Sequence, residues 1–211
     1  MKLDRETMRI YAVTAGTEDR EVLLRQVAEA IDGGARIVQL REKNLKGEAL
    51  LELAKRFADI CREKGAVSII NDDVTVCRDS GADGVHLGQG DMDARRARMI
   101  LGPDRLIGVS AHNVEEALRA ADDGADYLGS GAAFVTGTKT DAKPIDHEIY
   151  RAITEAVEVP VVAIGGITAE NMPRLAGRGL AGAAVVSAIF GQEDVCAAAR
   201  KLRALAETLF V

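Results

Sequence analysis

The fold can be inferred outward from one segment, Gly81-Ala82-Asp83-Gly84-Val85-His86-Leu87-Gly88-Gln89-Gly90-Asp91. Gly81 is expected to end a helix, because glycine adopts the left-handed conformation without a Cβ clash. Val85–Leu87 is a short and nearly continuous apolar run, which is typical of a parallel strand covered on both faces. The segment therefore predicts a helix end, a buried strand and a polar loop, in that order.

Comparable segments recur along the 211 residues, where Gly34, Gly124 and Gly179 also precede apolar runs. The predicted strands are the eight apolar runs Ile10–Val13, Ile37–Leu40, Val67–Ile70, Val85–Leu87, Leu106–Val109, Tyr127–Leu128, Val161–Ile164 and Ala183–Val186. Helical periodicity separates most of them, as over Leu50–Cys61. This alternation favours an α/β fold, a single (β/α)8 TIM-barrel domain over residues 1–211. A doubly wound open sheet is the alternative, because alternation alone does not show closure.

Composition and charge exclude several classes of function. A formal charge of −6 and an aromatic content of 3% disfavour nucleic-acid binding, which needs a basic face and, for single strands, stacking rings. The apolar run Ala181–Phe190 is far shorter than the roughly 20 residues of a membrane span, and residues 1–6 lack the apolar core of a signal peptide. Cys61, Cys77 and Cys196 are interpreted as reduced thiols packed on helices. The sequence therefore predicts a cytoplasmic protein with no membrane or nucleic-acid partner, and it leaves a homo-oligomer open.

Polar residues gather at one end of the predicted strand–helix units. In a barrel of this type the active site lies at the carboxyl ends of the strands. Polar clusters follow seven of the predicted strands: Gln39-Leu40-Arg41-Glu42-Lys43, Asn71-Asp72-Asp73, His86–Asp91, Ser110–His112, Gly129–Lys139, Gly165-Gly166 and Ser187–Ile189. Their shared position predicts a functional site more strongly than any one cluster does.

Arg41 and Lys43 are candidates for binding an anion. They lie two residues apart, so in extended backbone they face the same side. Arginine offers a planar fork to phosphate oxygens and lysine offers a point charge. The alternative is a solvated basic pair on a surface loop.

Asp72 and Asp91 are candidates for a Mg²⁺ site at the ends of adjacent strands. Magnesium typically takes one or two carboxylates, with waters and substrate phosphates completing its shell. The alternative is that Asp72 or Asp73 caps the helix beginning near Val74, a role that Asp73 fits better. Asp91 is equally compatible with a turn.

A phosphate site is predicted after strands seven and eight. Gly165-Gly166 and Ser187 resemble the site that many barrels build there from backbone N–H groups, although a tight structural turn is the alternative. Lys139 lies in the long connection Gly131–His147, and loops of such length in compact domains are often functional. We interpret it either as a cation that closes over an anion or as a solvated loop lysine.

The histidines point to no other chemistry. His86 is interpreted as a hydrogen-bonded core histidine rather than a catalyst, and His112, close to Ser110, forms no recognisable nucleophilic triad. The sequence shows no His/Cys metal cluster. None of the predicted strand interiors contains a lysine, which disfavours a Schiff-base aldolase among phosphosugar barrels.

Seven motifs occur in a characteristic order: Q-L-R-E-K from Gln39, N-D-D from Asn71, H-L-G-Q-G-D from His86, V-S-A-H from Val109, T-G-T-K from Thr136, I-G-G-I from Ile164 and V-V-S-A-I from Val185. Together they resemble the thiamine-phosphate synthase family, and the resemblance extends from Tyr11 to Leu209. It implies a transferase of thiamine biosynthesis that couples hydroxymethylpyrimidine diphosphate to a thiazole phosphate. It also implies a dissociative substitution, in which pyrophosphate leaves before the thiazole nitrogen attacks.

The resemblance further assigns residues to ligands. It places the pyrimidine diphosphate on Gln39, Leu40, Arg41, Glu42, Lys43, Asn71, Ser110 and Lys139. It places the thiazole phosphate on Thr136, Gly137, Thr138, Gly166, Val186 and Ser187, and it places Mg²⁺ on Asp72 and Asp91. The residues implied to be catalytic are Arg41, Lys43, Ser110 and Lys139. The three cations among them would stabilise the leaving pyrophosphate.

One region departs from the family pattern. The usual G-P-I-F-x-T-x-T-K reads Gly131-Ala132-Ala133-Phe134-Val135-Thr136-Gly137-Thr138-Lys139, and Asp146 replaces a common glycine. Ala132 and Val135 stand where prolines are usual, so we expect a more flexible segment. The difference motivates an alternative, a paralogue that acts as a thiazole tautomerase or binds thiamine phosphate as a regulator. The intact diphosphate and metal motifs argue against a tautomerase, because it has no pyrophosphate to stabilise.

Overall fold

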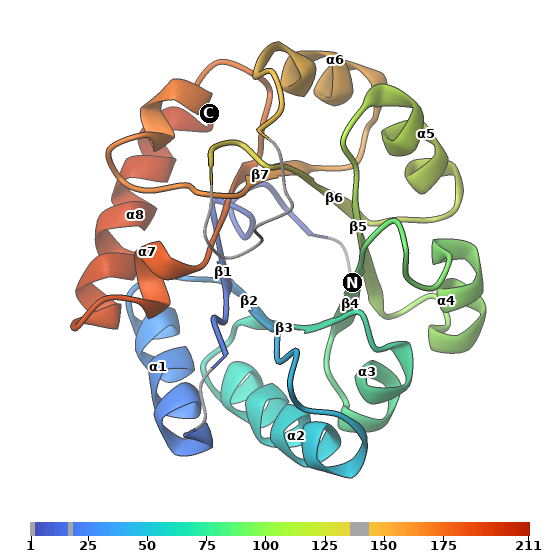
Figure 1. Cartoon of the computed structure of the whole chain (residues 1–211), viewed down its shortest axis with the longest axis vertical. Coiled ribbons are helices and arrows are strands. Elements are labelled where there is room, and N and C mark those ends of the chain that lie inside the picture. The colour runs from blue at the N-terminus through green and yellow to red at the C-terminus, as the bar shows by residue number, and fades with distance from the viewer. Residues whose placement is uncertain (1–2, 17–18, 136–143) are drawn as a thin grey trace.

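The computed structural model describes residues 3–16, 19–135 and 144–211. Eight parallel strands form a closed barrel, in which each strand pairs with the next and β8 pairs with β1 (Figure 1). The strands are β1 (Ile10–Val13), β2 (Ile37–Leu40), β3 (Val67–Asn71), β4 (Gly84–Leu87), β5 (Leu106–Ser110), β6 (Tyr127–Gly131), β7 (Val161–Ile164) and β8 (Gly182–Val185). This closure confirms the (β/α)8 barrel and excludes the open sheet.

Helices surround the barrel. They are α1 (Arg20–Asp32), α2 (Gly47–Glu63), α3 (Val74–Ser80), α4 (Ala94–Leu101), α5 (Val114–Asp122), α6 (Glu148–Ala156), α7 (Ser187–Phe190) and α8 (Val195–Leu209). Between β7 and β8 the described chain has only the short 3-10 helix η1 (Met172–Leu175). Several helices begin at an Asp or Asn whose side chain accepts a backbone N–H, namely Asp19, Asp73, Asp93, Asn113 and Asp194. Such caps stabilise the point at which each loop becomes a helix.

Two apolar cores explain why the strands read as nearly continuous apolar runs. Inside the barrel, Tyr11, Ile69 and Tyr127 pack with neighbours from the other strands. Outside it, strand residues such as Val38 pack against the surrounding helices. Both faces of each strand are therefore buried, as expected for a parallel sheet covered by helices.

The glycines that indicated the fold have the expected backbone conformation. Gly34, Gly81, Gly124 and Gly179 have φ values of 107°, 77°, 92° and 74°, all in the left-handed region. Strand β6 extends beyond the predicted Tyr127–Leu128 as far as Gly131, because backbone pairing with β7 continues where the apolar run stops. Gly179 follows the 3-10 helix η1 rather than an α-helix.

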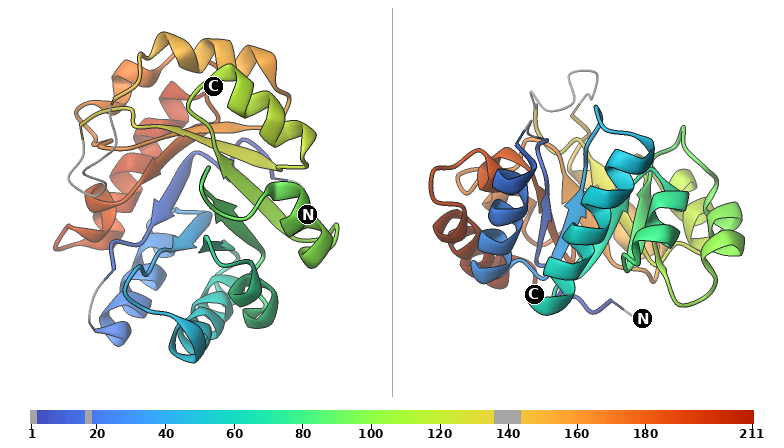
Figure 2. Two further views of the ribbon diagram at one scale, coloured as in Figure 1. Left: turned by 45° about the vertical axis from the view of Figure 1, so that its right-hand side comes forward. Right: turned by 90° about the horizontal axis from the view of Figure 1, so that it is seen from below.

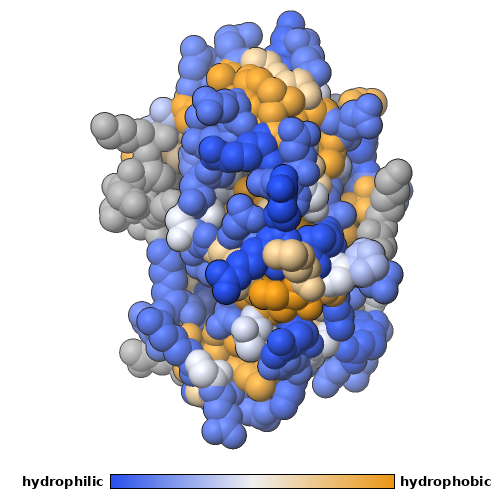
Figure 3. All heavy atoms as spheres, turned by 90° about the vertical axis from the view of Figure 1, so that its right-hand side faces the viewer, coloured by the Kyte–Doolittle hydropathy of each residue, from blue (hydrophilic) through white to orange (hydrophobic). Residues whose placement is uncertain are grey.

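Because the strands are parallel, their carboxyl ends all lie at one end of the barrel. The segment before β1 and the end of α8 lie at the opposite end (Figure 2). The outer face carried by α4 and α5 is mostly hydrophilic, although Met99 and Leu118 are exposed on these helices (Figure 3). Among the described helices, none combines the length and the apolar character that crossing a membrane requires.

Candidate active site

A cavity of about 250 Å³ opens at the carboxyl ends of the strands. One side, here called the polar wall, comes from β2 to β5 and the loops after them: Gln39, Arg41, Lys43, Asn71, Asp72, His86, Gly88, Asp91, Ser110 and His112. The other side, here called the glycine wall, comes from β6 to β8: Gly129, Gly131, Ala132, Ile164, Gly165, Gly166, Ile167, Ala184, Val186 and Ser187. The structure therefore brings the polar clusters of separate strand ends together around one space.

Arg41 and Lys43 both line the cavity, as their spacing predicts. Thr14 is fully buried, and its Oγ1 accepts a hydrogen bond from Arg41 N at 2.8 Å. This bond fixes the backbone where the chain leaves β2. The side chains of Leu40 and Glu42 are not part of the cavity lining, although the resemblance assigned both residues to the pyrimidine diphosphate. The reason is geometric, since alternate residues of extended backbone face opposite sides.

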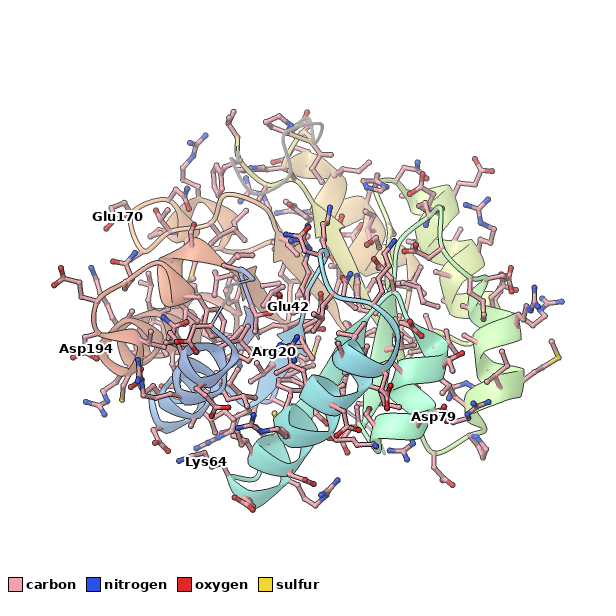
Figure 4. All side chains as sticks on the ribbon, turned by 60° about the horizontal axis from the view of Figure 1, so that its bottom comes forward. Arg20, Glu42, Lys64, Asp79, Glu170 and Asp194 are labelled. Atoms are coloured by element: carbon pink, nitrogen blue, oxygen red, sulfur yellow. The ribbon has the colours of Figure 1, made fainter. Side chains whose placement is uncertain are left out.

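Glu42 lines a neighbouring cavity of about 460 Å³ together with Gly16 and Arg20, and Arg41 and Lys43 line both cavities. Figure 4 labels the side chains of Glu42 and Arg20. Its Oε1 is buried and has no hydrogen-bond partner among the described residues. Burial raises the pKa of Glu42, and the positive charge of Arg41 opposes that rise. Glu42 is therefore a carboxylate that the fold stabilises poorly.

Asp72 and Asp91 approach each other at the cavity wall. Asp72 is exposed to solvent as a residue, yet partial burial of its carboxyl group, together with a hydrogen bond and repulsion from Asp91, raises its pKa to about 6. Asp72 also has a φ of 64°, an uncommon conformation for a residue with a side chain. The Asp91 carboxylate accepts a hydrogen bond from Gly88 N at 2.7 Å, which holds it in the turn after β4.

The N-terminal cap of α3 is provided by Asp73, the residue after Asp72. Asp73 Oδ1 accepts a hydrogen bond from Val76 N at 2.9 Å at the start of α3. Asp73 therefore has the capping role that the sequence favoured for it, and Asp72 is left to face the cavity.

His86 is a buried histidine, as predicted, and its ring also forms part of the polar wall. Its Nδ1 lies 3.2 Å from Tyr127 Oη and its Nε2 lies 3.1 Å from Ser110 Oγ. Burial lowers the pKa of His86 to about 4. Tyr127 Oη lies 2.8 Å from Tyr11 Oη, which accepts a hydrogen bond from Gln39 Nε2 at 2.7 Å. Gln39 and Ser110 are thus the two ends of one hydrogen-bond chain through the barrel.

The glycine wall presents backbone rather than charged side chains. Gly165 and Gly166 have φ values of 104° and 63°, and a Cβ added to Gly166 would lie 2.4 Å from Val135 O. The turn is also structural, because Gly166 O accepts a hydrogen bond from Asn171 Nδ2 at 2.8 Å. Ser187 lines the same wall where α7 begins. The tight turn is therefore confirmed, and it carries its backbone to the cavity; the phosphate site stays a prediction.

The loop after β6 begins in contact with the turn after β7. Phe134 N donates to Gly165 O at 3.0 Å, and the Phe134 ring packs edge-on against His147 at 5.0 Å. The Arg174 guanidinium lies 5.2 Å above the same ring. Four residues assigned by resemblance lie outside the described residues: Thr136, Gly137, Thr138 and Lys139.

Three residues that depart from the family pattern, Ala132, Val135 and Asp146, differ in their surroundings. Ala132 is buried against the cavity, whereas Val135 is 83% exposed. Asp146 Oδ1 accepts a hydrogen bond from Glu148 N at 3.0 Å at the start of α6. The replacement of glycine by Asp146 therefore supplies a hydrogen-bond acceptor for that helix terminus.

Two residues that organise the polar wall are not predicted by the sequence motifs. Tyr11 and Tyr127 project from β1 and β6 into the barrel, where their hydroxyls connect Gln39 with His86. One signal was available, because a tyrosine within a buried strand usually needs a partner for its hydroxyl. The identity of those partners depends on barrel closure and register, which single strands do not reveal.

The fold and the cavity define a (β/α)8-barrel protein that presents two cations, two carboxylates and a glycine-lined edge at its carboxyl end. Residues 10–189 match the family described as thiamine monophosphate synthase. The chain is 48% identical over 199 residues to the thiamine-phosphate synthase of Chloroflexus aurantiacus, covering 93% of this chain and 92% of that one. It is 45% identical over 198 residues to that of Methanocella arvoryzae, covering 93% of each. The chain therefore belongs to the thiamine monophosphate synthase family.

Solved structures agree with this membership. The thiamine phosphate pyrophosphorylase from Pyrococcus furiosus superposes with a TM-score of 0.88 at 39% identity, covering 98% of this chain and 99% of that one. A 3-hexulose-6-phosphate synthase superposes with a TM-score of 0.71 at 21% identity, covering 94% and 99%, and shares the fold. The eight described strands contain no lysine, which disfavours Schiff-base chemistry inside this barrel.

Proposed function

We propose that this protein is a thiamine-phosphate synthase, which couples hydroxymethylpyrimidine diphosphate to hydroxyethylthiazole phosphate and releases pyrophosphate. The observation that carries the proposal is that Arg41 and Lys43 meet Asp72 and Asp91 in one cavity. This combination suits a diphosphate with its divalent ion, and family membership supports the same reaction. The net charge of −6 is no obstacle, because the cations gather locally at the cavity.

In the proposed reaction, the bond between the pyrimidine methylene carbon and a diphosphate oxygen breaks, and the electron pair leaves with pyrophosphate. The thiazole nitrogen then donates its lone pair to that carbon. Because this nitrogen has no proton to lose, the step needs no general base. Arg41 and Lys43 would bind the leaving diphosphate and stabilise its growing charge, while the walls hold both substrates in line.

The proposal includes Mg²⁺ held by Asp72 and Asp91. The donor set supports a fit, because two carboxylates approach each other at the cavity wall, where burial and the nearby Asp91 raise the pKa of Asp72 and a divalent cation would offset their repulsion. Within the described ranges, no group of three or more His, Cys, Asp or Glu suits a metal ion, so substrate phosphate and water would complete the shell. When bound, the ion supplies positive charge to the departing diphosphate.

The glycine wall is proposed to take the thiazole phosphate, because Gly166, Val186 and Ser187 bring backbone and a hydroxyl to one side of the cavity. Thr136, Gly137, Thr138 and Lys139 belong to the same proposal through the family motif. The partners would then be small phosphorylated molecules in the cytoplasm, with no nucleic acid or membrane involved.

A two-substrate assay tests this function. Purified protein is mixed with both substrates and Mg²⁺, and thiamine phosphate and pyrophosphate are quantified with and without chelator. Equal amounts of the two products that disappear with chelator are expected. No product at high enzyme concentration would contradict the proposal, and tight calorimetric binding of thiamine phosphate without turnover would favour a regulator instead.

A further inference from the structure

The hydrogen-bond chain inside the barrel connects two residues of the polar wall. It runs from Gln39 Nε2 to Tyr11 Oη, on to Tyr127 Oη, then through the two ring nitrogens of His86 to Ser110 Oγ. The heavy-atom separations are 2.7, 2.8, 3.2 and 3.1 Å in that order. Every link is therefore short enough to be a hydrogen bond.

The chain has a direction, because each hydroxyl has only one proton to donate. Gln39 donates to Tyr11, so the Tyr11 proton has only Tyr127 as an acceptor among the described residues. The Tyr127 hydroxyl then donates its hydrogen bond to His86 Nδ1. A neutral imidazole has one N–H, so Nε2 carries it and donates to Ser110 Oγ. Reversing any inner link leaves a buried hydroxyl proton without an acceptor, which costs roughly 1–3 kcal/mol.

The direction determines what the two ends offer to a ligand. Ser110 Oγ already accepts a hydrogen bond from His86 Nε2, so the Ser110 hydroxyl can donate its own hydrogen into the cavity. Gln39 uses its amide nitrogen on Tyr11, so its Oε1 is left as an acceptor. The polar wall thereby gains one fixed acceptor and one fixed donor. With the Gln39 amide turned over, every bond would reverse and the two roles would be exchanged.

The surrounding residues are arranged for these rings. A Cβ on Gly108 would lie 2.1 Å from the Cζ atom of Tyr127, and a Cβ on Gly129 would lie 3.1 Å from Cε1 of His86. Glycine at these two strand positions therefore leaves the space that the rings occupy. Gln89 Nε2 also donates to Ser110 O at 2.6 Å, which fixes the backbone at the far end of the chain.

We infer that Tyr11, Tyr127 and His86 are positioning residues, whose hydrogen-bond direction presents Gln39 Oε1 as an acceptor and the Ser110 hydroxyl as a donor to the pyrimidine diphosphate. The inference rests on the proposed function for the identity of the ligand. It does not rest on that function for the direction of the chain. The three residues act through Gln39 and Ser110 and need not touch the substrate.

Nitrogen-15 NMR of the imidazole rings tests the direction without any substrate. In the wild-type protein at about pH 7, His86 is expected to show a protonated Nε2 and an Nδ1 that accepts a hydrogen bond. Its signals are assigned by elimination with His112→Asn and His147→Asn. In Tyr127→Phe, the Nδ1 resonance should move to the value of a nitrogen without a hydrogen bond. In Tyr11→Phe it should stay close to wild type, because Tyr127 still donates to His86.

Steady-state kinetics test the effect on the ligand. Tyr127→Phe should lower kcat/KM for the pyrimidine diphosphate about tenfold, as for loss of one hydrogen bond of about 1.4 kcal/mol, and leave KM for the thiazole phosphate unchanged. Tyr150→Phe is the matched control. It removes another buried hydroxyl, which bonds Ser130 O at 3.3 Å outside the chain, and should leave both the His86 signals and the rates at wild-type values.

Each outcome is decisive. Protonated Nδ1 in the wild-type protein would overturn the inference, as would Tyr127→Phe with unchanged His86 signals and unchanged kcat/KM. A wild-type protein that makes no thiamine phosphate would remove the proposed function, yet its His86 signals would still show whether the chain has the stated direction. Should Tyr127→Phe fail to fold, the wild-type tautomer and the Tyr11→Phe spectrum carry the test.

Discussion

The polar wall, contributed by β2 to β5, presents cations, carboxylates and hydrogen-bonding side chains, whereas the glycine wall, contributed by β6 to β8, presents mostly backbone. Specific hydrogen bonds hold the polar wall: Arg41 N donates to Thr14 Oγ1, and Gly88 N donates to the Asp91 carboxylate. On the glycine wall, the shape comes from the positive φ angles of Gly165 and Gly166. The same cavity is thus made by two different structural means.

The two walls would therefore have different roles in the proposed reaction. Cations held at the point where negative charge develops stabilise the transition state, which suits the diphosphate that leaves. A backbone edge offers fixed dipoles, which suit a phosphate that only anchors its substrate. Substitutions in the polar wall should therefore lower kcat, and substitutions in the glycine wall should raise KM for the thiazole phosphate.

The largest effect is expected from Asp72→Asn. Loss of the carboxylate should lower kcat about 10³-fold, since an ion that stabilises several kcal/mol of transition-state charge would be lost. Without metal, the melting temperature should rise, because the substitution removes a charge that burial and the nearby Asp91 both disfavour. Mg²⁺ should raise the melting temperature of the wild-type protein but not of the variant.

Asp73→Asn, one residue away, is the control and should retain wild-type kcat, because asparagine also caps α3. A full Mg²⁺-induced shift in Asp72→Asn would rule out this site.

Arg41→Gln should lower kcat about 10²-fold, because it removes a charged donor from the leaving diphosphate. Arg36→Gln is the matched control, since Arg36 is exposed just before β2, at the opposite end of that strand. The measurement is steady-state kinetics with the pyrimidine diphosphate varied. An increase in KM with unchanged kcat would show that Arg41 binds the ground state only, and would weaken the assignment of the polar wall to the leaving group.

Gly166→Ala tests the opposite wall. The added Cβ would clash with Val135 O at 2.4 Å and would be strained at a φ of 63°, so the backbone must shift. We expect KM for the thiazole phosphate to rise about tenfold, the value of one lost hydrogen bond of about 1.4 kcal/mol, with KM for the pyrimidine diphosphate unchanged. Gly177→Ala has a similar φ of 71° and nothing within 4 Å of the added Cβ. Gly177→Ala should lower the free energy of unfolding and leave both KM values unchanged. Equal changes in both KM values would contradict a division of labour between the walls.

The two walls also differ in how far the sequence predicts them. Most strand positions and the shared side of Arg41 and Lys43 follow from local pattern, because period and turn chemistry are local properties, whereas barrel closure does not. The roles of Tyr11 and Tyr127 do not follow, since β1 and β6 meet across the barrel only after closure. The family motif assigned Glu42 to the site, because a sequence motif specifies which residue stands at a position but not the side to which its side chain points. The roles of individual residues in binding remain predictions.

The smallest effect concerns Glu42, which leaves the polar wall on the reverse side of the strand end. Burial raises its pKa in the folded protein, so its contribution to stability is present below its unfolded pKa and is lost as the pH rises through its folded pKa. Glu42→Gln should therefore increase the free energy of unfolding at about pH 8 by less than about 1 kcal/mol, because the group is only half-buried. The gain should shrink as the pH falls toward about 4. Urea unfolding at both pH values measures this gain in the free energy of unfolding.

Glu21→Gln is a control of opposite sign. Arg56 lowers the pKa of Glu21, so loss of the Glu21 carboxylate should reduce stability at neutral pH. A loss of stability in Glu42→Gln at about pH 8 would show that the Glu42 carboxylate has a stabilising partner after all.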